Sequence, residues 1–199
     1  MDSRLIKSAT LHALPPPERE LSSPQEAFKT LENAYFLGYV PRPVVLICVG
    51  ENPLAVAWHM PTNKDPFMYA VAISKENYSY KLVVEGSNFT VNFLPKDHLE
   101  DILIAGRVHG DKENKWELFK ELKPIKALKV RALMVEQSLL VYECTQYRSV
   151  ELPDHTLLIG RVELIHYKRG KLKPHKIRYP LHMGKGYFST NCRLLKVNL

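Results

Sequence analysis

Pro43-Val44-Val45-Leu46-Ile47-Cys48-Val49 is an apolar stretch rich in β-branched residues, and the turn-forming residues Gly50-Glu51-Asn52-Pro53 follow it directly. β-branched side chains fit the pleated surface of a sheet, and Gly, Asn and Pro favour tight turns. We therefore expect a strand over 43–49, a turn over 50–53 and a return strand over Leu54–His59. This hairpin indicates a fold built mainly of strands.

Further strand-like segments follow the hairpin after a loop predicted over 61–66. The strands are predicted over 67–73, 89–94, 139–144, 157–167 and 171–173, with a turn at 168–170. Helical spacing of apolar residues is confined to 76–85, 96–105 and 114–122, with Gly86 and Gly106 placed to end the first two segments. Because the chain lacks the regular β-α alternation of a doubly wound sheet, this order favours a closed β-barrel with short peripheral helices.

The N-terminal region has a different character. Residues 1–25 contain Pro15-Pro16-Pro17 and little apolar periodicity, so we expect an extended arm there. Pro24–Asn33 is predicted to form a short helix with Ser23 as its N-cap. A chain of 199 residues is long enough for one domain with a sizeable core, which we expect over 26–199.

The composition favours a soluble protein that binds anions. The formal net charge is +7 and the pI is about 9.2, and a basic balance attracts nucleic acids, phosphates and dinucleotides. No nucleic-acid recognition motif accompanies the charge, so we do not expect nucleic-acid binding. With no secretory signal and no apolar run long enough to cross a bilayer, the protein is expected to be cytoplasmic. Cys48, Cys144 and Cys192 have no CxxC spacing, which indicates reduced thiols and no metal site.

The motifs of several common enzyme classes are missing. The sequence has no GxGxxG, GxxxxGK[ST], HExxH or GxSxG pattern, so a Rossmann enzyme, a P-loop enzyme, a zincin and an α/β-hydrolase are unsupported. Four other segments stand out in order along the chain. They are 57–66 (AWHMPTNKDP), 72–80 (AISKENYSY), 89–95 (FTVNFLP) and 105–110 (AGRVHG), the last followed by Lys115-Trp116.

In this order, the four segments resemble the flavin-reductase-like, FMN-binding split-barrel family, particularly its flavoredoxin-like and archaeal members. The likeness covers about 37–119, with a weaker echo at 179–184. It implies a six-stranded Greek-key split β-barrel that forms a homodimer, with FMN near the subunit interface. The residues that it implies for FMN binding are Ala57, Trp58, His59, Met60, Pro61, Thr62, Ser74, Lys75, Ser79, Asn92, Gly106, His109 and Lys115.

The resemblance also implies roles for these residues. Segment 57–62 contacts the isoalloxazine ring and ribityl chain, Ser79 and the residues before it hold the phosphate, Asn92 lies close to the ring, and the loop 106–115 closes over the site. FMN chemically needs an apolar slot for its ring and cationic or hydroxyl donors for its phosphate. The family usually has an arginine where Asn77 stands, so a bidentate phosphate clamp is missing, and Lys75 or Lys115 would supply charge without the fork.

Structural interpretations stand beside these functional ones. Trp58 could be a core residue, Asn92 could satisfy backbone groups, and Ser79 could be an exposed hydroxyl on a helix. The charges over Lys112–Lys120 could form a solvated helix face, with Lys115 as the possible exception. His182 could line the flavin pocket or lie on the surface.

The function implied by the resemblance is an NAD(P)H-dependent flavin or ferric reductase. Electrons pass from the nicotinamide through FMN to a second acceptor, which is a small molecule or a redox protein, and no catalytic side chain is required. The alternative is a flavoredoxin-like FMN-binding electron carrier without its own nicotinamide site. A basic nucleic-acid-binding barrel without flavin ranks below both.

Overall fold

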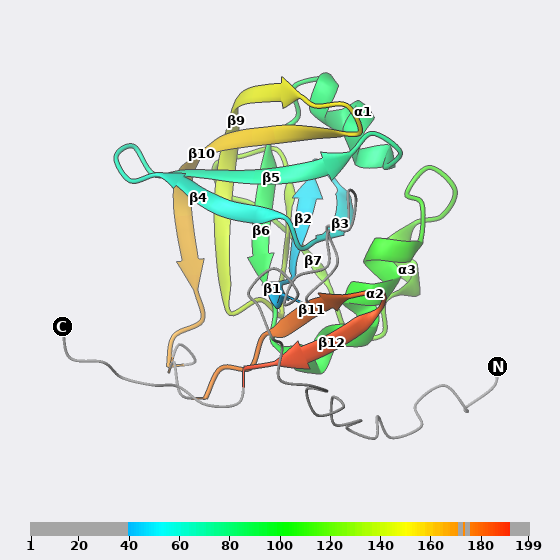
Figure 1. Ribbon diagram of the computed structural model, residues 1–199. Coiled ribbons are helices and arrows are strands. Elements are labelled where there is room, and N and C mark those ends of the chain that lie inside the picture. Colours follow the sequence, from blue (N-terminus) through cyan, green and yellow to red (C-terminus); the bar gives the residue numbers. More distant parts are fainter. Residues whose placement is uncertain (1–39, 171–172, 174–175, 192–199) are drawn as a thin grey trace, which may run out of the picture. The chain divides into compact units, whose positions relative to one another are not determined.

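The computed structural model describes residues 40–170, 173 and 176–191, all within the unit that spans 36–199. The expected arm over 1–25 and the helix over 24–33 lie outside this range, as do Cys192 and most of the strand expected over 171–173. Seven strands form one antiparallel sheet in the order β3-β2-β6-β9-β10-β5-β4 (Figure 1). They are β2 (Val45–Val49), β3 (Asn52–Val56), β4 (His59–Asn63), β5 (Met68–Ser74), β6 (Phe89–Phe93), β9 (Leu140–Glu151) and β10 (His155–Tyr167).

Smaller elements surround this sheet. β1 (Arg42–Pro43), β11 (Pro180–Gly184) and β12 (Tyr187–Thr190) form a three-stranded sheet, and β7 (Pro124–Lys126) pairs with β8 (Leu133–Val135). The helices are α1 (Tyr78–Val84), the 3-10 helix η1 (Lys96–His98), α2 (Leu99–Arg107) and α3 (Lys115–Leu118). None of the helices in the described part of the chain is long and apolar enough to cross a membrane. The expectation of a mainly β fold with short helices is confirmed.

The main sheet curls around one hydrophobic core. Ile47 and Leu54 from one end of the strand order share this core with Val71 and Leu158 from the other end, and Phe89 lies fully buried among them. Side chains from strands so far apart in the order can share a core only because the sheet coils on itself. Its edge strands β3 and β4 are not hydrogen-bonded to each other among the described residues.

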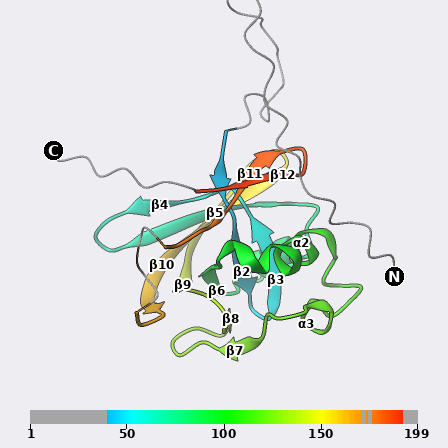
Figure 2. The same cartoon turned by 90° about the horizontal axis from the view of Figure 1, so that it is seen from below.

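The central strand β2 is buried on both faces, which explains its uninterrupted apolar sequence. Val45, Ile47 and Val49 face the inner core, while Leu46 and Cys48 face a second core with Ile102 of α2. Seen from below, α2 lies over β2 and β3 (Figure 2). Burial raises the pKa of the Cys48 thiol to about 12, so this free cysteine is a packed, protonated side chain.

The main sheet has seven strands where six were expected, because one predicted strand is divided. The return strand predicted over 54–59 bends at Ala57 and Trp58 and becomes β3 and β4. β4 then extends to Asn63, so the loop predicted over 61–66 is shorter than expected. Gly86 ends α1 as predicted, with φ of +80°, whereas Gly106 lies inside α2, which continues to Arg107. The helix expected over 114–122 is reduced to the single turn of α3.

One glycine is required by close packing inside the curled sheet. A Cβ atom at Gly160 of β10 would lie 2.5 Å from Cζ of Phe89 and 2.9 Å from Cβ of Cys144. Both neighbours are fully buried and have no room to move. Gly160 therefore allows the Phe89 ring to fill the inner core.

Candidate functional site

A cleft of about 360 Å³ lies where the segment between β3 and β4 passes over β5, and we call it the β4–β5 cleft. Its lining residues are Pro41, Arg42, Pro43, Ala57, Trp58, His59, Met60, Ala70, Ala72 and Leu157. Ala72 pairs with Leu157, and Ala70 pairs with Met60. Since paired residues in antiparallel strands share a face, these side chains form a small, apolar floor on the outer face of the sheet. A flat apolar ring would match this floor.

His59 links a wall of the β4–β5 cleft, at Pro43, to Tyr69 of the inner core. Its Nε2 lies 3.0 Å from the carbonyl oxygen of Pro43, and its Nδ1 lies 2.6 Å from the hydroxyl of Tyr69. Because a carbonyl oxygen can only accept, Nε2 carries the proton, and the Tyr69 hydroxyl donates to Nδ1. Burial lowers the pKa of His59 below its ordinary value, which favours this neutral form. The imidazole thus connects β1, β4 and β5.

Trp58 and Lys75 lie at one end of β5, beside the cleft. The Trp58 indole is 39% exposed and stacks on His155, with ring centroids 4.9 Å apart. His155 pairs with Ser74, so the indole, the Ser74 hydroxyl and the Lys75 backbone are neighbours. The Lys75 ammonium pairs with Glu151 at 2.9 Å, and this contact raises the pKa of Lys75 and lowers that of Glu151. The cationic group at this end of the cleft is therefore partly neutralised.

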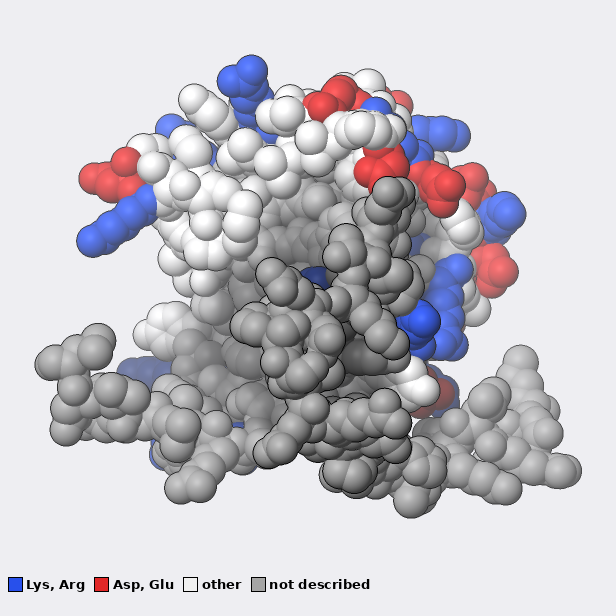
Figure 3. Space-filling view, viewed as in Figure 1, with Lys and Arg blue, Asp and Glu red and all other residues white. Residues whose placement is uncertain are grey.

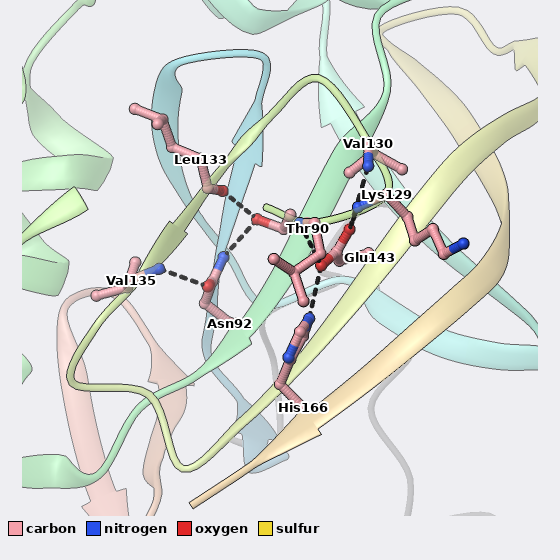
Figure 4. A network of polar contacts seen from close by, with 9 residues as sticks. Thr90, Asn92, Lys129, Val130, Leu133, Val135, Glu143 and His166 are labelled. Atoms are coloured by element: carbon pink, nitrogen blue, oxygen red, sulfur yellow. Dashed lines mark hydrogen bonds and ion pairs between the residues drawn. The ribbon is translucent and has the colours of Figure 1, made fainter. Parts of the chain in front are cut away.

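Asn92 is a core residue. Its side-chain amide donates to the Leu46 carbonyl at 3.1 Å. The same amide donates to Thr90 Oγ1 at 2.8 Å, and the Asn92 Oδ1 accepts from the backbone N–H of Val135 at 2.9 Å (Figure 4). The side chain is fully buried and does not line the β4–β5 cleft. These contacts support the structural interpretation, in which Asn92 ties β6 to β2 and β8.

The same network holds a second buried polar group, Glu143. This carboxylate accepts from the backbone N–H groups of Leu128, Lys129 and Val130 and contacts His166 Nε2 at 2.6 Å (Figure 4). Burial alone would raise its pKa, but the three backbone donors and His166 outweigh burial, so the pKa of Glu143 lies below its ordinary value. Glu143 therefore anchors the 128–130 loop, and sequence inspection gave no sign of this role.

Two residues expected at the phosphate end, Ser79 and Lys115, are buried elsewhere. Ser79 accepts a hydrogen bond from Asn52 Nδ2 at 2.7 Å and is fully buried, so it is not the exposed hydroxyl of the structural interpretation. The ammonium of Lys115 donates to the carbonyls of Pro53 at 2.8 Å and Ala105 at 2.9 Å, and burial lowers its pKa to about 8. Lys115 is 3% exposed, so it is the exception to a solvated helix face that the sequence allowed. Its role in phosphate binding stays a prediction.

The remaining predicted residues lie in three places. Pro61 and Thr62 are exposed and line a separate shallow cleft beyond the β4–β5 cleft. Gly106 lines a cleft of about 320 Å³ together with Ala57 and His182, so His182 lies near one end of the predicted ring-binding segment. His109 is exposed in the loop after α2, where its carbonyl accepts from Lys112 and Glu113.

The structure thus brings together Ala57, Trp58, His59 and Met60, with Ser74 and Lys75 nearby, and separates the others. Six lining residues were missed: Pro41, Arg42, Pro43, Ala70, Ala72 and Leu157. The alternation within 67–73 carried a usable signal, because it places Ala70 and Ala72 on the face opposite Tyr69, Val71 and Ile73. No cluster of three potential metal-ligating side chains occurs among the residues that were searched, namely the described ones.

Comparisons with known proteins identify the family of this chain. The family model described as "Flavin reductase like domain" matches residues 37–190. An uncharacterized protein of Archaeoglobus fulgidus is 31% identical over 161 residues, which cover 77% of this chain and 89% of the relative.

Two solved structures have the same fold. Flavoredoxin from Methanosarcina acetivorans matches with a TM-score of 0.73 and 23% identity, covering 86% of this chain and 96% of the other. An FMN-binding protein from Thermus thermophilus with bound 1-cyclohex-2-enone matches with a TM-score of 0.75 and 18% identity, covering 86% and 98%.

Proposed function

This chain belongs to the flavin reductase like domain family, and on that premise we propose that it is an FMN-dependent oxidoreductase that passes electrons from NAD(P)H to a second acceptor. The observation that carries the proposal is the β4–β5 cleft. Residues 57–60, part of the segment 57–62 that the family resemblance assigns to the isoalloxazine ring and ribityl chain, form one wall of this cleft above an apolar floor.

The residues present fit FMN at its ring end. The methyl groups of Ala70 and Ala72 leave the floor flat, and the partly exposed Trp58 and Met60 supply apolar edges. Ligand sites typically combine such a surface with a few polar groups that fix orientation. FMN, when bound, supplies a two-electron acceptor for hydride. The protein orients the reactants and excludes water, so no acid-base side chain is needed.

At the phosphate end, the fit depends on Ser74 and Lys75. These residues follow the floor along β5 and would supply a hydroxyl and an ammonium to the phosphate. Asn77 supplies no guanidinium fork, and Glu151 competes for Lys75. We therefore infer that the phosphate is held by single-point contacts and that binding is sensitive to the charge of Glu151.

A homodimer is also part of this proposal. Large apolar side chains are left in solvent: Met60, which lines the cleft, is 55% exposed, and Leu152 and Tyr147 elsewhere on the surface are 42% and 65% exposed. Exposed apolar surface beside a ligand cleft is typical of a protein interface. A second copy covering this face would enclose the ring. Light scattering should give about twice the chain mass of 22.9 kDa, and a mass near 22.9 kDa would contradict the dimer.

The experiment that tests the activity is an anaerobic titration of the FMN-loaded protein with NADH and NADPH. Bleaching of the flavin's visible absorption by either nucleotide supports the proposal. If the bound FMN is reduced by a redox protein but by neither nucleotide, the chain is instead an electron carrier.

A pair of variants tests the location. Ala72→Leu fills the floor of the β4–β5 cleft and should abolish FMN binding. Val150→Leu also enlarges an apolar side chain on the same face, by one methylene, at a position opposite Leu157 but outside the cleft, and should leave binding unchanged. Equal FMN affinity in both variants would place the flavin elsewhere.

A further inference from the structure

A second cleft, of about 580 Å³, lies at the junction of three segments distant in sequence, and we call it the basic cleft. Its charged lining residues are Lys96, Lys168, Lys173, Lys176, Arg178 and Asp97. It shares no lining residue with the β4–β5 cleft. Nothing in the proposed flavin chemistry uses it.

Backbone hydrogen bonds hold the described walls of the basic cleft in place. The N–H of Lys96 donates to the carbonyl of Arg178 at 2.7 Å, and the N–H of Lys168 donates to Leu139 at 2.8 Å. Within the C-terminal wall, the N–H of Lys176 donates to the carbonyl of Lys173 at 2.8 Å. The cations are therefore carried by anchored backbone from separate parts of the chain.

The charges in this cleft are unbalanced. Among its described lining residues are four lysines and a single carboxylate, Asp97, which is paired with Lys96 at 3.1 Å. Arg178 has partners of its own, among them the Ile177 carbonyl, and is left out of this balance. Lys168 donates to the backbone carbonyl of Glu136 at 3.1 Å, which leaves its charge without a counterion in that contact. Bringing like charges together costs free energy that a bound anion would offset.

This imbalance is particular to the basic cleft. The similarly large cleft beside α3 is lined by Glu51, Asp111 and Glu113 as well as Lys112 and Lys115, so its acidic side chains outnumber its basic ones. On the face shown in Figure 3, acidic and basic side chains are interspersed along the edge over α1. The net charge of +7 is therefore not evenly distributed over the described surface.

We propose that the basic cleft binds a phosphate-bearing small molecule of nucleotide size, at a site separate from the β4–β5 cleft. A volume of 580 Å³ lies within the range typical of sites for small ligands. Lysine ammonium groups act as point charges toward phosphate oxygens, and cations from two separate parts of the chain, Lys96 on one side and Lys168, Lys173 and Lys176 on the other, suit a ligand with more than one anionic group. A pyrophosphate-bearing nucleotide has this chemistry.

The test is calorimetric titration of the full chain with ADP, with adenosine as the uncharged control. The variant Lys96→Gln/Lys173→Gln/Lys176→Gln should lose ADP affinity by about tenfold or more, because each lost phosphate contact is charge-assisted. The matched variant Lys64→Gln/Lys81→Gln/Lys112→Gln removes the same charge from exposed positions outside the cleft and should bind ADP as the unmodified chain does.

Several results would overturn the proposal. They are the absence of ADP binding, equal losses in the two triple variants, or tighter binding of a duplex oligonucleotide than of ADP. Titrations with inorganic pyrophosphate, NADH and NADPH then show which part of the ligand is recognised. Binding of all three supports a site that recognises the pyrophosphate group alone. FMN binding is measured separately. If the Ala72→Leu variant binds ADP with the same affinity as the unmodified chain, the two sites are distinct.

Discussion

The imidazole Nδ1 of His59 lies 2.6 Å from the hydroxyl of Tyr69, so the histidine expected at the flavin has this nitrogen engaged inside the protein. Its other nitrogen, Nε2, donates a hydrogen bond to the carbonyl of Pro43. The residue therefore acts on the β4–β5 cleft by tying its Pro43 wall to β4 and to Tyr69 of the inner core.

Replacing His59 should loosen the cleft. In His59→Leu, the Pro43 carbonyl and the Tyr69 hydroxyl both lose a partner, and we expect a loss of roughly 1–3 kcal/mol in the free energy of unfolding together with weaker FMN binding. His59→Gln keeps an N–H donor for Pro43 and should recover most of the FMN affinity. Tyr69→Phe is the control, because it keeps the bond to Pro43. Denaturant unfolding and FMN fluorescence titration measure the two effects, and a Gln variant as weak as the Leu variant would argue against this role.

The charge of Glu151 should oppose phosphate binding at Lys75. Glu151→Gln frees the Lys75 ammonium and removes a negative charge, so FMN affinity at low salt should rise by roughly two- to tenfold. Lys75→Gln should lower it. The gain should shrink as salt is added, because both groups are partly exposed. An affinity that is insensitive to both substitutions would place the phosphate away from this end of β5.

Lys115 should make stability depend on pH in the alkaline range. Its pKa is about 8 in the folded protein and about 10.5 when exposed, so between these values the unfolded state binds more protons. The contribution of Lys115 to the free energy of unfolding therefore rises from pH 8 to pH 10.5, by roughly 1–3 kcal/mol. The free energies of unfolding in urea of the unmodified chain and of Lys115→Met should diverge in this pH range. The free energy of Lys112→Met, a substitution at an exposed position, should change with pH in parallel with that of the unmodified chain.

Glu143→Gln should destabilise the 128–130 loop. The amide of glutamine cannot accept with both of its side-chain atoms, so at least one backbone N–H loses its partner, and we expect a cost of roughly 2–4 kcal/mol. Because the pKa of Glu143 is depressed, its contribution is present above about pH 4.5 and is lost as the pH falls below that value. Hydrogen exchange at 128–130 should accelerate in the variant, and unchanged protection there would refute the anchoring role.

Much of the fold could be predicted from sequence because the responsible signals are local. The β-branched run over 43–49 and the turn after it gave β2, and Gly86 gave the end of α1. The division between β3 and β4 was missed because the bend at Ala57 carries no Gly or Pro. β9 extends to Glu151, well past the predicted 139–144, because its polar second half faces solvent and lacks the apolar pattern of a core strand.

The site was harder to predict because its neighbours are distant in sequence. The floor of the cleft depends on the pairing of β5 with β10. In this pairing Ala72 lies opposite Leu157, which is about 85 residues further along the chain. The burial of Lys115 depends on carbonyls of Pro53 and Ala105, whereas the polar residues around it in sequence indicated a solvated helix. Only the fold brings these groups together.

The most direct test is to measure FMN binding by the purified chain. The quenching of flavin fluorescence reports binding, and it is recorded in parallel for the unmodified protein and for the variants Ala72→Leu and Val150→Leu. The account predicts stoichiometric FMN binding by the unmodified protein and by Val150→Leu, and its loss in Ala72→Leu. If the unmodified protein does not bind added FMN, or if the Ala72→Leu variant stays folded and binds FMN normally, the β4–β5 cleft is not the flavin site.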